Sequence, residues 1–80
     1  MKYLLFTTQT CPKCPEIKQY INDNVFFEGE ILDNTHPKFI ELAGKYDVIS
    51  APLFIVFEEE SEIFRGSEVY EIEEFLKSNS

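Results

Sequence analysis

Cysteine and tryptophan are scarce in this chain. Its 80 residues include two cysteines and no tryptophan. Two cysteines are too few for the disulfide framework of a small secreted domain, and they suit a reactive pair in a reducing compartment. We therefore expect a cytoplasmic protein. The apolar core must be built from phenyl rings, because eight phenylalanines and four tyrosines supply all the aromatic side chains.

Basic residues are also few. Seven lysines and arginines stand against fifteen aspartates and glutamates, which gives a formal net charge of −8. Binding to nucleic-acid phosphates needs a basic face, so we expect no nucleic-acid partner. For the same reason we expect no binding to an anionic membrane surface.

Long apolar runs are missing as well. The longest continuous ones are Tyr3–Phe6 and Leu53–Phe57, and both are too short for a signal-peptide core or a membrane span. Short continuous runs of this kind predict strands that are buried on both faces of a sheet. A chain of this length is near the lower limit for an independent core, so we expect one domain over residues 1–80. We also expect a monomer.

The spacing of apolar residues predicts the element order β-α-β-α-β-β-α. The first crossover makes the first two strands parallel, and the last two strands form an antiparallel hairpin. The fold class is therefore α/β, with a mixed four-stranded sheet flanked by helices. The expected strands are Tyr3–Phe6, Val25–Leu32, Leu53–Phe57 and Glu62–Arg65, and the expected helices run from Pro15 to Asn22–Asn24, from Phe39 to Tyr46 and from Val69 to Leu76.

The two cysteines form the motif Cys11-Pro12-Lys13-Cys14 between the first strand and the first helix. In that position a C-x-x-C motif is typical of a redox-active dithiol. Unpaired backbone N–H groups and the positive end of the helix dipole favour a thiolate there, and the charge of Lys13 can add to this effect. A thiolate can attack a disulfide, and the second thiol can resolve the mixed disulfide. No cofactor is needed for this chemistry.

The alternative is a non-catalytic module that binds a metal ion or an iron–sulfur cluster. A structural metal site needs two ligands besides these cysteines. Such ligands are usually cysteines or histidines, and His36 is the only other residue of either kind in the sequence. Such a module would therefore use the same cysteines from two chains as a dimer.

Taken together, these features resemble the thioredoxin fold, and within it the small glutaredoxin-like redoxins. The matching features are the C-P-x-C motif, the segment Lys45–Val48, Pro52 at the start of the third strand and Gly66 before the last helix. The resemblance implies a thiol–disulfide oxidoreductase that reduces protein disulfides. It assigns the nucleophile to Cys11 and the resolving thiol to Cys14.

The resemblance also implies where a substrate binds. Pro52 would be a cis proline that faces the dithiol, and the backbone before it would hold an extended substrate peptide. An ordinary trans proline in a plain loop is the simpler interpretation from sequence alone. The expected substrate-binding residues are Pro12, Lys13, Ser50, Ala51, Pro52, Gly66 and Ser67.

Departures from the family pattern bear on the source of electrons. Thioredoxins carry Asp and Trp where this chain has Leu5 and Thr10, and glutaredoxins that bind glutathione usually have a cation where it has Thr8. Glu68 and Glu71 at the start of the last helix would repel an anionic tripeptide. We therefore expect a reductase of the thioredoxin reductase type to be a better partner than glutathione. The resemblance to electron donors of ribonucleotide reductase implies that enzyme as a partner.

Overall fold

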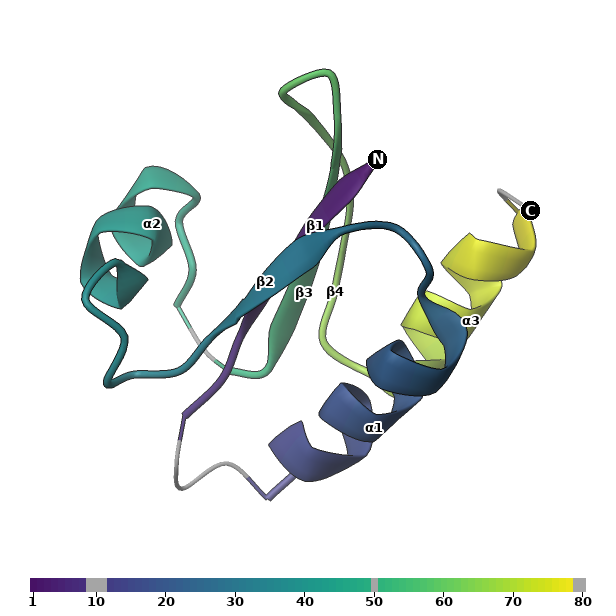
Figure 1. Cartoon of the computed structure of the whole chain (residues 1–80), viewed down its shortest axis with the longest axis horizontal. Coiled ribbons are helices and arrows are strands. Elements are labelled where there is room, and N and C mark those ends of the chain that lie inside the picture. Colours follow the sequence, from purple (N-terminus) through teal and green to yellow (C-terminus); the bar gives the residue numbers. More distant parts are fainter. Residues whose placement is uncertain (9–11, 50, 79–80) are drawn as a thin grey trace.

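The computed structural model describes residues 1–8, 12–49 and 51–78. Its elements follow the predicted order (Figure 1). Among the described residues, no helix combines the length and the apolar character that crossing a membrane requires. The elements are β1 (Lys2–Phe6), α1 (Cys14–Asn24), β2 (Gly29–Leu32), α2 (Phe39–Lys45), β3 (Leu53–Glu58), β4 (Ser61–Gly66) and α3 (Val69–Ser78).

The four strands form one mixed sheet in the order β2-β1-β3-β4. β1 pairs in parallel with β2 and antiparallel with β3, and β3 pairs antiparallel with β4. The two strands with continuous apolar runs, β1 and β3, are therefore the central ones. This confirms the predicted sheet and its α/β class.

Helices cover both faces of the sheet. Side chains alternate along a strand, so Leu5 and Phe6 of β1 point to opposite faces. Leu5 packs with apolar residues of α1 and α3, whereas Phe6 packs against α2. Figure 1 shows α2 on one side of the sheet and the pair α1 and α3 on the other. The core on the α1 and α3 side contains the buried residues Leu5, Ile17, Ile21, Val25, Phe54, Val56 and Ile72.

The predicted strand Val25–Leu32 is wrong in its first half, because β2 begins only at Gly29. The Val25 backbone N–H donates to the Ile21 carbonyl at 2.9 Å, so this residue closes α1 instead of starting a strand. Phe26, whose apolar side chain favoured the strand, is 89% exposed. Pairing with β1 becomes possible at Gly29, where any side chain would collide with the ring of Tyr3.

α2 is a short helix of seven residues, and none of its residues is fully buried. At 1.5 Å of rise per residue, such a helix spans only about 10 Å. It therefore covers only part of its face of the sheet and leaves the rest accessible.

Candidate active site

The sheet brings the predicted site segments to one end, which we call the dithiol end. Phe6 at the close of β1 pairs with Leu53 at the start of β3, and Phe54 pairs with Gly66 at the close of β4. The start of α1 lies at the same end of the molecule (Figure 1). The residues after β1, before β3 and after β4 therefore share the dithiol end.

The described part of the C-P-x-C motif opens α1. Cys14 is the first residue of the helix and is only 2% exposed, whereas Pro12 and Lys13 before it are exposed. This burial suits the resolving role expected for Cys14, which requires a sulfur that substrate does not reach. Cys11 lies outside the described residues, so its assignment as nucleophile stays a prediction.

The Ala51–Pro52 peptide bond is cis, as the resemblance implies. Pro52 is buried and Ala51 is half-buried, at the point where β3 begins beside the end of β1. Ser50 lies outside the described residues. That Pro52 faces both sulfur atoms and that Ala51 binds a substrate backbone stay predictions.

Gly66 is buried at the end of β4. A side chain there would approach the Phe64 ring to 2.7 Å and the Glu71 Cβ atom to 3.2 Å, so close packing requires glycine. Ser67, the next predicted substrate residue, is half-buried and leads into α3. The packing accounts for Gly66 without any substrate, and its role in substrate binding stays a prediction.

Two glutamates organise the start of α3. One carboxylate oxygen of Glu71 accepts hydrogen bonds from the backbone N–H groups of Ser67 and Glu68, each at 3.1 Å. Glu68 forms an ion pair with Lys13 at 2.5 Å, which joins the start of α3 to the start of α1. The protein's own carboxylate thus occupies N–H groups that would otherwise be open to an anionic ligand.

Arg65 is held by contacts within the protein. Its guanidinium pairs with both carboxylate oxygens of Glu62, at 3.0 and 2.7 Å, and donates to the Tyr46 carbonyl at 2.6 Å. The hydrogen bond from Arg65 lowers the pKa of the Glu62 carboxyl below its ordinary value. Arg65 therefore ties β4 to the end of α2.

Thr7 is a residue of the dithiol end that the sequence analysis did not single out, since it follows the predicted strand Tyr3–Phe6. Its backbone N–H donates to the Leu32 carbonyl at 2.8 Å and its side chain is fully buried. The hydroxyl has no hydrogen-bond partner among the residues that the structure describes. Continuing the alternation of β1 from Leu5 would have placed Thr7 on the face that α1 covers.

The described residues also bear on the alternative metal module. Among residues 1–8, 12–49 and 51–78, no three His, Cys, Asp or Glu side chains are placed to hold a metal ion. The module expected from sequence would draw Cys11 and Cys14 from two chains, and Cys11 lies outside this part. The alternative stays a hypothesis.

Comparison with known proteins finds related folds without related sequences. No family model and no curated protein sequence matches the chain. Thioredoxin 1 of Thermosipho africanus superposes with a TM-score of 0.70 at 20% identity, over 99% of this chain and 90% of that one. Fasciola hepatica thioredoxin gives 0.77 at 21% identity, over 99% and 80%. Thioredoxin O2 of Arabidopsis thaliana gives 0.80 at 17% identity, over 96% and 72%. With this element order, this sheet and these structural neighbours, the chain has the thioredoxin fold.

Proposed function

We propose that the chain is a dithiol–disulfide oxidoreductase of the glutaredoxin-like kind, which reduces protein disulfides with Cys11 and Cys14. The observation that carries the proposal is the buried Cys14 at the first residue of α1, at the sheet end where Pro52 opens β3. The thioredoxin fold of the chain supports it. We place this activity in the cytoplasm, where thiols are kept reduced.

The reaction transfers two electrons to the substrate. The Cys11 thiolate attacks one sulfur of the substrate disulfide, forms a mixed disulfide and releases the first substrate thiolate. Cys14 loses its proton and attacks the Cys11 sulfur, which releases the second substrate thiolate and leaves a Cys11–Cys14 disulfide. Solvent protonates the two substrate thiolates, and a reductase returns the dithiol. Burial of Cys14 directs it to Cys11 and away from other disulfides.

The electron source in this proposal is a flavoprotein reductase of the thioredoxin reductase type, with glutathione a poor reductant. The contacts of the candidate glutathione-binding groups support this choice. Glu71 occupies the N–H groups at the start of α3, Glu68 pairs with Lys13, and Glu62 pairs with Arg65. A glutathione molecule would have to displace these contacts to place its two carboxylates. Delivery of the electrons to ribonucleotide reductase is part of the same proposal.

Insulin disulfide reduction tests the activity, with electrons from NADPH and either thioredoxin reductase or glutathione plus glutathione reductase. Cys11→Ser should abolish turnover, because no other thiol of the chain can form the mixed disulfide. Cys14→Ser should trap a mixed disulfide that mass spectrometry detects, since no second thiol resolves it. Turnover that survives in Cys11→Ser would refute the proposed roles.

The same assay decides the electron source. We expect turnover with thioredoxin reductase to exceed turnover with glutathione. Fast turnover with glutathione and none with thioredoxin reductase would place the protein with the glutathione-dependent glutaredoxins, while leaving the proposed oxidoreductase activity intact.

A further inference from the structure

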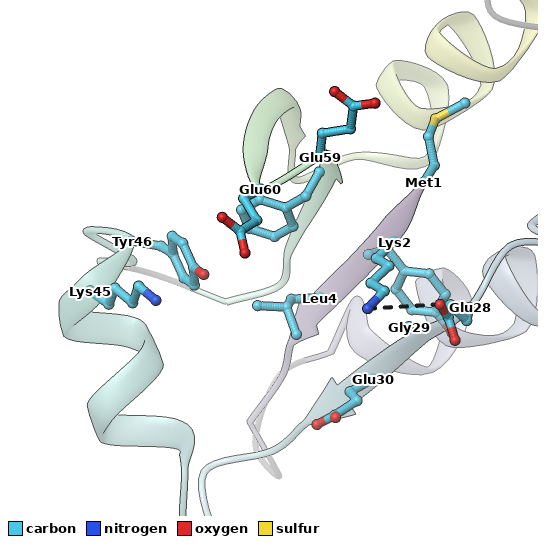
Figure 2. A pocket seen from close by; sticks show the side chains of 12 residues that line it. Met1, Lys2, Leu4, Glu28, Gly29, Glu30, Lys45, Tyr46, Glu59 and Glu60 are labelled. Carbon is cyan, nitrogen blue, oxygen red and sulfur yellow. Dashed lines mark ion pairs between the residues drawn. The ribbon is translucent and has the colours of Figure 1, made fainter.

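A second surface feature lies at the other end of the sheet, which we call the hairpin end because β3 turns into β4 there. A groove of about 820 Å³ opens on the face that α2 covers only in part. It lies between β1, β2, the end of α2 and the β3–β4 turn (Figure 2). The proposed redox chemistry uses none of its residues.

The floor of the groove is apolar. Leu4 and Phe57 come from the central strands and are partly buried against the core on the α2 side. The Tyr46 ring follows the last turn of α2 and lies 4.9 Å from the Phe57 ring, centroid to centroid. Because α2 ends at Lys45, the chain itself leaves this apolar floor open to a ligand.

The rim of the groove is mainly acidic. Its charged side chains are four glutamates and two lysines. Lys2 already pairs with Glu28 at 3.8 Å, whereas Glu30 and Glu60 have no ion pair within the described part of the chain. In Figure 2 the Glu60 carboxylate points toward the space between Tyr46 and Leu4, and Glu30 borders that space from β2. The other lysine of the rim, Lys45, lies over the Tyr46 ring, with its ammonium 5.4 Å from the ring centroid. Two carboxylates therefore stand beside an apolar floor without an ion-pair partner among the described residues.

We propose that this groove binds an extended segment of a partner protein in which arginine or lysine alternates with apolar residues. The basic side chains pair with Glu30 and Glu60, and the apolar ones lie on Leu4 and Phe57. A second copy of this chain is disfavoured as the occupant, because two acidic rims of a protein with net charge −8 would repel each other. A partner bound here would leave the dithiol end uncovered.

The probe for this proposal is a fluorescein-labelled hexapeptide of alternating arginine and leucine. We expect saturable binding by fluorescence anisotropy, with backbone NMR shifts confined to the groove. The double variant Glu30→Gln with Glu60→Gln should weaken binding by about threefold to tenfold, as expected for two partly exposed ion pairs. The matched control, Asp23→Asn with Glu74→Gln, changes the net charge equally at exposed helix positions outside the groove and should leave binding unchanged.

Two further peptides separate the contribution of the ion pairs from that of the apolar contacts. Glutamate in place of arginine should abolish binding, and serine in place of leucine should weaken it strongly. Equal weakening by both double variants would reduce the effect to long-range attraction and overturn the proposal. NMR shifts that map to the dithiol end would also overturn the proposal. Shifts at the groove that appear when the protein is concentrated without peptide would overturn it too, because they would identify a second copy of the chain as the occupant.

Discussion

Thr7 places a hydroxyl group in the interior of the dithiol end. Its side chain is fully buried, and its oxygen bonds to no described residue. A buried polar group without a hydrogen bond costs stability, because its contacts with water are lost and not replaced. The backbone N–H of the same residue, in contrast, donates a hydrogen bond to the Leu32 carbonyl.

We predict that Thr7→Val stabilises the protein. Valine has nearly the same shape and removes the hydroxyl, so the free energy of unfolding should rise by about 1–2 kcal/mol. Urea unfolding followed by circular dichroism measures the change. The matched control is Thr35→Val, which should lower stability, because the Thr35 hydroxyl donates to the Asp33 carboxylate. A loss of stability in Thr7→Val would reveal a hydrogen bond that the hydroxyl makes in solution.

At the level of single residues, the position of the motif at the head of α1 could be predicted and the polar contacts could not. The position of Cys14 at the head of α1 follows from a strand, a loop and a helical pattern around a C-x-x-C motif. The contacts of Arg65 with Glu62 and with the Tyr46 carbonyl bridge β4 and the end of α2. No local pattern indicates such a contact between distant segments.

The β3–β4 hairpin is the element with the least favourable backbone. Glu59 and Glu60 form its two-residue turn, and both have positive φ values, 50° and 71°. Such turns favour Asn-Gly, because a Cβ atom is strained in the left-handed region. The two glutamates place acidic side chains at the groove, although their positive φ values lower the stability of the turn.

We predict that Glu59→Asn with Glu60→Gly stabilises the hairpin. The free energy of unfolding should rise by about 1–2 kcal/mol, because both residues tolerate positive φ and the adjacent carboxylates are removed. The control Glu59→Gln with Glu60→Gln removes the charges but keeps the side chains. If thermal or urea unfolding shows equal gains for both variants, charge repulsion and not backbone strain explains the effect.

The elements differ in how well sequence predicted them. β1 and β3 were predicted correctly, because a sheet centre needs continuous apolar runs. The start of β2 was not, because Val25 and Phe27 are apolar for a different reason. They pack against the core from the end of α1 and from the connection that follows it. An apolar residue shows that a contact exists, but not which backbone conformation makes it.

For the whole molecule, the excess of acidic residues sets the response to salt. The ion pairs Lys2–Glu28 and Lys77–Glu73 are well exposed, and pairs of this kind contribute little to stability. Repulsion among the remaining carboxylates acts over longer distances, and we expect it to outweigh the attraction within these exposed pairs.

We predict that moderate salt stabilises the protein. Raising NaCl from about 20 to about 200 mM shortens the screening length from about 20 to about 7 Å and should raise the urea midpoint. The control is a variant in which Glu58 and Glu74 are both replaced by lysine, which brings the net charge from −8 to −4 and should reduce the salt effect. A midpoint that falls with salt would mean that the ion pairs contribute more than the repulsion costs.

The overall arrangement was predictable because strand order and crossover rules admit few ways to bury two apolar strands. The groove was not, because it depends on α2 ending after seven residues and on the hairpin standing beside it. The pattern of residues specifies neither the length of α2 nor the position of the hairpin relative to it.

The central position of β1 also determines when the protein can fold during its synthesis. β1 is made first, but its antiparallel partner β3 begins at Leu53, and Leu5 packs against Ile72 of α3. A ribosome adds about 5–20 residues per second, so β3 is synthesised roughly 3–10 seconds after the Tyr3–Phe6 run. During that interval the nascent chain exposes an apolar strand without its main partner, and it is open to chaperone binding. The core on the face with Leu5 can therefore form only after α3 has left the exit tunnel.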